Sequence, residues 1–295
     1  MVTAIIALID VIAVQNILGE CANWHTASGQ LWWTDIQGRR LYRYDPASQV
    51  LSHFDTPWRL CSFAFADGGG LIAAFEQGVA LYNPALQTCD WLFRLADNHA
   101  PVRFNDGRTD RQGRFWAGTM MEGPFDSLRP LGQISCFDRS GMVQRYGEKV
   151  KITNSLCTSP DGRLLYFSDS PQHVIYVCDL DPDNGALSNQ RIFAQTPAGA
   201  QPDGAVTDSE GCLWSAQWGA SRLVRYTPDG RIADTLAMPV SQPTSIAFGG
   251  PQMNLLCVTT ARDGLPQDEL LRQPQAGDLF IYQTDVTGLA DAQFA

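Results

Sequence analysis

The stretch "QPDGAVTDSEGCLWSAQWG", residues 201–219, combines a polar head, an apolar strand, a glycine turn and a second, tryptophan-bearing strand. Asp203 stands at the head of a run that has the pattern of a buried strand, where an unpaired carboxylate is costly. Gly211 then marks a turn of the kind that separates two short strands. The fold follows from how this unit recurs along the chain.

Weaker copies of the unit are spread over the whole sequence. The clearest are "SGQLWWTD" from Ser28, "GGLIAAFEQGVALYNP" from Gly69, "QGRFWAGTM" from Gln112, "DGRLLYFSDSPQHVIYVCD" from Asp161 and a degenerate "MNLLCVTT" from Met253. Their anchors are spaced by 41, 43, 49, 49 and 42 residues and fall at Gly29, Gly70, Gly113, Gly162, Gly211 and Met253. That spacing suits one four-stranded propeller blade per unit, and helical periodicity is almost absent. The sequence therefore predicts an all-β fold, a six-bladed β-propeller.

Composition indicates a soluble globular protein. The 295 residues are 44% hydrophobic and 18% charged, with a formal net charge of -10. No basic run is present to neutralise phosphates, so we expect no nucleic-acid or membrane partner. The eight cysteines lie mostly in apolar runs without a CxxC pair, which favours buried free thiols over the alternative of a disulfide framework.

The apolar N-terminus, "MVTAIIALIDVIAV", fits a strand better than a signal peptide. It contains Asp10 and has neither a basic region nor a small-residue cleavage site. No other run approaches the roughly 20 apolar residues that a membrane helix needs. A ring of blades must close or expose two strand edges. We therefore expect residues 1–295 to form one propeller domain, with residues 5–14 pairing with the C-terminal blade, in a cytoplasmic protein that is monomeric by default.

A polar residue stands eight or nine positions before each anchor. These residues are Glu20, Ser62, Asn105, Asn154, Asp203 and Ser245. The innermost strands of a propeller line its channel, so we expect these side chains to converge. Glu20, Asn154 and Asp203 are hard oxygen donors, and the two carboxylates would repel each other unless a cation lay between them. Oxygen ligation suits Ca²⁺, Mg²⁺ or Mn²⁺, although Zn²⁺ also accepts carboxylates.

A simpler interpretation is that these residues only shape turns. Asn, Asp and Ser are common before glycine because their side chains bond nearby backbone groups. That explanation suffices for any one position. It is less consistent with three oxygen donors at the same point of the repeat.

Five stretches around the polar positions point to a known family. They are "LGECANWH" from Leu18, "RFNDGRTDRQGRFWAGTM" from Arg103, "ITNSLCTSPDGRLLYFSDS" from Ile152, "PDGAVTDSEGCLWSAQWG" from Pro202 and "PTSIAFGG" from Pro243. Together they resemble the family of senescence marker protein 30, also called regucalcin, with the bacterial gluconolactonases and other sugar lactonases. The resemblance covers most of the chain and implies a six-bladed propeller with one divalent cation in its channel.

The resemblance also implies roles for individual residues. It assigns Glu20, Asn154 and Asp203 as metal ligands and Asp203 as the general base as well. It assigns Arg103 and Asn105 as substrate contacts, and Glu122 as a further acid near the substrate. The implied reaction is hydrolysis of a sugar lactone to the aldonic acid, with Ca²⁺, Zn²⁺, Mn²⁺ or Fe²⁺ as the cation.

The chain departs from the family pattern at two places. Cys21-Ala22 follows Glu20 where the family usually has Gly-Pro, and Ser155 follows Asn154 where it usually has Gly. The ligating side chains are kept, whereas the backbone beside them, on which substrate preference depends, is altered. Residues 39–59 and 120–131 are the expected loops over the channel. Trp24 and Trp218 are candidates to border it.

Two other functions remain open at the level of sequence. One is hydrolysis of a different ester or an organophosphate on the same fold. The other is a calcium-binding propeller without catalysis, because a fold does not dictate a function. A serine hydrolase is disfavoured because no G-x-S-x-G motif occurs, and the four histidines lie outside the repeated polar position.

Overall fold

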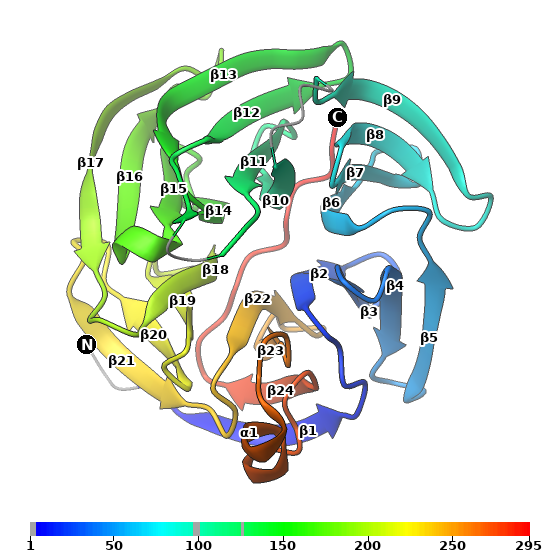
Figure 1. Cartoon of the computed structure of the whole chain (residues 1–295), viewed down its shortest axis with the longest axis vertical. Helices are drawn as coiled ribbons and strands as arrows, with labels where there is room; N and C mark the ends of the chain where they lie inside the picture. The colour runs from blue at the N-terminus through cyan, green and yellow to red at the C-terminus, as the bar shows by residue number, and fades with distance from the viewer. Residues whose placement is uncertain (1–3, 97–100, 125–126) are drawn as a thin grey trace.

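Six four-stranded antiparallel sheets stand around a common axis like the blades of a propeller (Figure 1). This arrangement is seen in a computed structural model that describes residues 4–96, 101–124 and 127–295. The prediction of an all-β, six-bladed propeller is confirmed.

Each blade has four strands, ordered from the axis outward. The innermost strands are β2 (Gly19–His25), β6 (Leu60–Phe65), β10 (Val102–Thr109), β14 (Thr153–Thr158), β18 (Gln201–Thr207) and β22 (Pro243–Gly249). The second strands are β3 (Gln30–Asp35), β7 (Leu71–Phe75), β11 (Phe115–Met121), β15 (Leu164–Asp169), β19 (Leu213–Trp218) and β23 (Leu255–Thr260). The third strands are β4 (Arg40–Asp45), β8 (Gly78–Asn83), β12 (Gly132–Asp138), β16 (Val174–Leu180), β20 (Arg222–Tyr226) and β24 (Leu279–Thr284). The outer strands are β5 (Val50–Asp55), β9 (Thr88–Arg94), β13 (Gly141–Val150), β17 (Leu187–Gln195), β21 (Ile232–Ala237) and β1 (Ile6–Ile12).

The last blade is built from both ends of the chain. Strand β1 pairs antiparallel with β24, so that Ile6 lies opposite Thr284 and Ile12 opposite Leu279. The N-terminal segment thus supplies the outer strand of the blade that holds β22, β23 and β24. This pairing joins the first blade to the last without a covalent bond. A short helix, α1 (Gln267–Arg272), lies in the connection between β23 and β24.

A repeated turn explains why the sequence units fold as blades. In the fifth blade, Oδ1 of Asp208 accepts two backbone N–H bonds within the turn, at 3.0 Å each, and Oδ2 accepts from the indole N–H of Trp214 at 3.0 Å. Gly211 supplies the positive φ of 80° that the turn requires. The same bond joins Asp110 to Trp116 in the third blade at 2.9 Å. The turn is therefore tied to the core tryptophan of the second strand.

The eight cysteines are free thiols, and all but Cys89 are buried. Burial raises the pKa of the thiols, to about 11 at Cys61 and about 12 at Cys157. They therefore pack as small apolar side chains, and the prediction of buried free thiols is confirmed. Within the described ranges, no helix combines the length and apolar character that crossing a bilayer requires.

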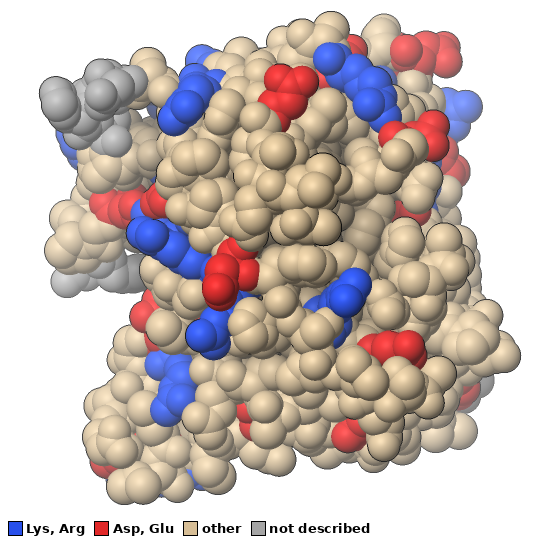
Figure 2. Space-filling model, turned by 90° about the vertical axis from the view of Figure 1, so that its right-hand side faces the viewer, with Lys and Arg blue, Asp and Glu red and all other residues tan. Residues whose placement is uncertain are grey.

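Charged side chains are interspersed on the side of the ring that Figure 2 presents. Blue basic groups alternate there with red acidic groups among uncharged residues. Outside its grey atoms, that face carries no continuous basic surface of the kind that binds a phosphate backbone.

The C-terminal tail, residues 285–295, crosses the middle of the ring in Figure 1. Its Asp291 forms an ion pair with Arg108 at 2.9 Å, and the backbone N–H of Phe294 donates to the carbonyl of Phe65 at 2.8 Å. Arg108 stands near one end of strand β10, whereas Arg103 stands near the other. The tail therefore closes the Arg108 end of the channel.

Phe294 anchors this tail, because its side chain is fully buried in an interblade apolar cluster. Replacing Phe294 by Ala is expected to lower the free energy of unfolding by about 3–5 kcal/mol, through lost burial and the cavity left behind. Urea unfolding measures the change. Gln293→Ala, at the exposed neighbouring position, is the control and should change stability by less than about 0.5 kcal/mol. Equal stability of the two variants would contradict the packing of the tail.

Candidate active site

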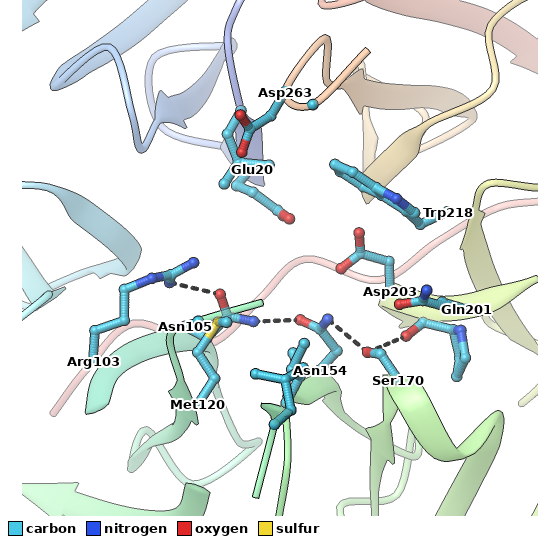
Figure 3. A pocket seen from close by; sticks show the side chains of 16 residues that line it. Glu20, Arg103, Asn105, Met120, Asn154, Ser170, Gln201, Asp203, Trp218 and Asp263 are labelled. Carbon is cyan, nitrogen blue, oxygen red and sulfur yellow. Dashed lines mark hydrogen bonds between the residues drawn. The ribbon is translucent and has the colours of Figure 1, made fainter. Parts of the chain in front are cut away.

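A cavity of about 490 Å³ lies at the end of the channel opposite the tail. Its polar wall carries Glu20, Arg103, Asn105, Asn154 and Asp203, which Figure 3 shows pointing toward one another. Apolar side chains, including Leu18, Met120, Ile152 and Trp218, complete the wall. The volume is in the range of small-molecule binding sites.

Four of the six polar positions found in the sequence meet in this cavity. Glu20 is on β2, Asn105 on β10, Asn154 on β14 and Asp203 on β18. They therefore come from four different blades, each at the same place on its innermost strand. Asn105, Asn154 and Asp203 are buried, and Glu20 is partly buried.

The two serines do not join them, so the expected convergence of all six is wrong for these positions. Ser245 accepts a hydrogen bond from the backbone N–H of Ala22 at 3.1 Å. The hydroxyl of Ser62 is buried deeper, against Gly107, and has no hydrogen-bond partner among the described residues.

The strands that carry Glu20, Asn154 and Asp203 are irregular at these residues. The register of β2 shifts after Glu20, that of β14 after Asn154 and that of β18 near Asp203. Such bulges redirect a side chain out of the regular alternation. Cys21 and Ser155, the two departures from the family pattern, adopt left-handed conformations with φ of 52° and 61°. This backbone shape is the one that glycine favours, so the bulge is kept without glycine.

The cavity concentrates buried negative charge. Burial, and then the nearby Asp106 carboxylate, raise the pKa of Glu20 to about 8. Burial, and then the charges of Glu20 and Asp106, raise the pKa of Asp203 well above its usual value. Neither Glu20 nor Asp203 has a salt-bridge partner in the part of the chain that the structure describes. A positive charge placed between the two would reverse both shifts.

Arg103 and Asn105 form the opposite wall. Nη1 of Arg103 donates to Oδ1 of Asn105 at 2.8 Å and to the carbonyl of Phe104 at 2.8 Å. The amide nitrogen of Asn105 donates to Oδ1 of Asn154 at 2.9 Å. The cavity thus offers a guanidinium and two oriented amides on one side, and two carboxylates on the other (Figure 3).

Glu122 lies behind Arg103 and is not among the residues that line the cavity. Its carboxylate accepts two bonds from Arg59, at 2.7 and 2.9 Å, and one from Arg103 at 3.2 Å. Burial would raise the pKa of Glu122, but these hydrogen bonds and charges outweigh it and the pKa is lowered. Glu122 therefore orients Arg103, and its direct contact with a substrate stays a prediction.

Other expectations about the rim are met in part. Trp218 borders the cavity, whereas Trp24 is buried in the core against Gly249. The segment 120–131 contributes Met120, Gly123 and Leu128 to the wall. Most of the segment 39–59 is not a loop, because it forms β4 and β5.

Among the polar residues that line the cavity, Ser170 and Asp263 were not predicted from the sequence. They lie outside the innermost strands, in the connections that follow β15 and β23. The repeat could not identify them, because it marks positions on strands.

Comparison with known proteins places the chain in a family. Residues 18–262 match the model described as the SMP-30/Gluconolactonase/LRE-like region. The chain belongs to this family. The resemblance found in the sequence is thereby confirmed.

Two relatives and one solved structure cover nearly the whole chain. A 6-deoxy-6-sulfogluconolactonase of Pseudomonas putida is 38% identical over 290 residues, 97% of each chain. An L-arabinolactonase of Azospirillum brasilense is 37% identical over 284 residues, 95% of this chain and 93% of that one. A calcium-binding protein, regucalcin, from Agrobacterium tumefaciens has a TM-score of 0.91 at 28% identity, over 98% of each chain.

The raised pKa of Glu20 gives a testable pH dependence. The pKa of Glu20 is about 8 in the folded protein without a bound cation, and its ordinary value is 4.5. Between pH 4.5 and pH 8 the folded protein therefore keeps a proton on Glu20 that the unfolded chain has lost. Its stability therefore falls as pH rises from 4.5 to 8, by about 1.4 kcal/mol per pH unit for one proton.

Urea unfolding in EDTA at pH 5.5, 6.5 and 7.5 tests this against Glu20→Gln, whose side chain does not titrate. We expect the variant to gain stability relative to the parent protein as pH rises. A difference that is constant over this range would contradict the shift.

Proposed function

We propose that this chain hydrolyses a sugar lactone to the open-chain aldonic acid, using one divalent cation held by Glu20, Asn154 and Asp203. The observation that carries the proposal is the convergence of a buried carboxylate, a partly buried carboxylate and a buried amide on one cavity, opposite a guanidinium. The names of the two bacterial relatives support lactone hydrolysis, and that of the regucalcin structure supports a cation.

The residues present fit a hard divalent cation. Two carboxylates and an amide oxygen are donors that Ca²⁺ and Mn²⁺ accept, and Zn²⁺ or Fe²⁺ also bind carboxylates. No group of three His, Cys, Asp or Glu side chains among the described residues is placed to hold a metal ion, so the amide oxygen of Asn154 is the third donor of the proposed site. When bound, a divalent cation would supply the positive charge that polarises the lactone carbonyl.

Asp203 is the residue suited to move the proton. Its ionised carboxylate accepts a proton from the attacking water as the water oxygen bonds to the carbonyl carbon. When the ring C–O bond breaks, the same carboxyl returns the proton to the leaving alkoxide, so water is added across the ester. Without a cation, burial raises the pKa of Asp203, and a bound cation would lower it again, which would keep the carboxylate ionised and able to accept the proton.

Arg103 and Asn105 bind and orient the substrate. Nη1 and Nε of Arg103 are used by protein acceptors. Its remaining nitrogen has no acceptor among the described residues and can donate to a ring oxygen or a hydroxyl of the substrate. Trp218 and Met120 provide apolar surface for the C–H faces of a sugar. A small polyhydroxylated ring is therefore the ligand that this wall accommodates.

The balance of charge favours a neutral sugar lactone. A divalent cation would compensate Glu20 and Asp203, and Glu122 already compensates Arg103. Asp263 remains, and no basic side chain lies within salt-bridge distance of it among the residues described. Its carboxylate can accept hydrogen bonds from hydroxyl groups of the sugar, and it repels a carboxylate or sulfonate substituent on the substrate.

Asp263→Asn is therefore expected to raise kcat/KM for an anionic sugar lactone relative to a neutral one by about 3- to 10-fold, because one repulsive charge is removed. The ratio is measured at low and at high salt, and the difference should shrink as salt screens the charge. Asp67→Asn, which makes the same change in net charge on an exposed turn, is the control. An unchanged ratio would contradict this role of Asp263.

The reaction itself is tested by proton release from a panel of aldono-1,4- and 1,5-lactones, with spontaneous hydrolysis subtracted. We expect turnover that EDTA abolishes and a divalent cation restores, and a loss of at least about 100-fold in kcat in Asp203→Asn, since general-base catalysis contributes that much. Melting in EDTA checks that the variant is folded.

Two outcomes would favour the other functions. Turnover of hydrophobic esters that survives Arg103→Ala would indicate a different ester hydrolase. Cation binding without turnover of any lactone would indicate a binding propeller.

A further inference from the structure

A continuous line of hydrogen bonds crosses one wall of the cavity, drawn as dashes in Figure 3. It runs from Arg103 to Asn105 (2.8 Å), from Asn105 to Asn154 (2.9 Å), from Asn154 to Ser170 (2.9 Å) and from Ser170 to the carbonyl of Pro202 (2.7 Å). Pro202 precedes Asp203 in strand β18. The line therefore links three of the proposed substrate and cation residues, Arg103, Asn105 and Asn154, and ends beside Asp203.

The two ends of the line determine the direction of every bond in it. Arg103 has only donors, so the atom of Asn105 that faces it must be Oδ1. The amide nitrogen of Asn105 then faces Asn154 and also donates to the carbonyl of Thr153 at 3.0 Å. Oδ1 of Asn154 must therefore accept from Asn105.

The other end of the line requires the same direction of hydrogen-bond donation. The carbonyl of Pro202 can only accept, so the single proton of the Ser170 hydroxyl is directed to it. The oxygen of Ser170 is then an acceptor for the amide nitrogen of Asn154. Ser170 is 3% exposed, so water does not readily replace this bond. A reversed Asn154 amide would face a donor at Asn105 and lose its acceptor at Ser170.

Ion pairs fix the position of Arg103 on the side away from the cavity. Arg59 donates from Nε to Glu76 at 2.6 Å and through both terminal nitrogens to Glu122, which accepts from Arg103. The donor end of the line is therefore anchored by ion pairs, and its acceptor end by the backbone.

We propose that Ser170 is a positioning residue that, together with Asn105, sets the orientation of the Asn154 amide, so that its oxygen and not its nitrogen is available to a cation. An amide nitrogen has no lone pair to offer, so a reversed Asn154 would remove one ligand. This inference rests on the proposed function, because it concerns the cation site of that reaction. It adds a residue that the family resemblance does not assign.

The test is calorimetric titration of Mn²⁺ into the protein, without a lactone. Ser170→Ala is expected to weaken Mn²⁺ binding by about 10- to 100-fold, the usual effect of removing a partner that orients a ligand. Ser170→Thr keeps the hydroxyl and should retain most of the affinity. Ser168→Ala is the matched control, because Ser168 is a buried serine whose hydroxyl also donates to the Pro202 carbonyl, at 3.3 Å. Ser168 pairs with Asn154 across the strands, but its hydroxyl forms no hydrogen bond with the Asn154 amide among the described residues. Its affinity should stay within about twofold.

The variant Asn154→Asp distinguishes an effect on the orientation of side chain 154 from a non-specific effect of Ser170→Ala on the cation site. Either oxygen of a carboxylate can bind a cation, so the orientation of the side chain no longer matters. Adding Ser170→Ala in this background should therefore leave the Mn²⁺ affinity within about twofold, and melting in EDTA checks that each variant is folded.

Three results would overturn the proposal: unchanged affinity in Ser170→Ala, an equal loss in Ser168→Ala, or an equal effect of Ser170→Ala in both backgrounds. Mn²⁺ binding by the parent protein in any of these cases would leave the proposed function standing. If the parent protein binds no Mn²⁺, both the proposed cation site and the positioning role of Ser170 are overturned.

Discussion

Repulsion between two carboxylates held in one cavity is the constraint on which the site depends. Glu20 and Asp203 belong to the first and fifth blades, and each sits on a strand that is hydrogen-bonded within its own blade. They cannot separate without breaking those strands or opening the ring. The closed propeller therefore maintains an arrangement that is unfavourable for two ionised groups. Without a cation, the raised pKa values allow protonation to relieve the repulsion, and a bound cation would relieve it with both groups ionised.

Closure comes from both ends of the chain, and it also shapes the cavity. The N-terminal strand β1 completes the last blade, while the C-terminal tail crosses the channel and buries Phe294. The ion pair between Asp291 and Arg108 fastens the tail to strand β10, whose other end carries Arg103. The same strand thus seals one end of the channel and presents a polar side chain at the other, so the cavity opens on one side only.

The repeat predicted the blades and four of the cavity residues, because each blade is one unit and the innermost strand always reaches the axis. It could not predict that Ser62 and Ser245 turn elsewhere, since side-chain direction depends on the local bulge and not on the repeat. It could not predict the place of Glu122, which Arg59, from another blade, draws away from the cavity. Long-range ion pairs of this kind leave no periodic signal.

The two departures from the family pattern show how local and global structure are joined. A left-handed residue other than glycine costs about 1–2 kcal/mol, so Cys21 and Ser155 need compensating contacts. Cys21 and Ser155 each form a side-chain hydrogen bond with a residue of the neighbouring blade. The thiol of Cys21 accepts the N–H of Phe63 at 3.1 Å, and the hydroxyl of Ser155 donates to the carbonyl of Asp203 at 2.5 Å. Glycine could make neither bond. In this chain the residues beside two proposed ligands therefore also bind neighbouring blades together, which couples the geometry of the site to the packing of the ring.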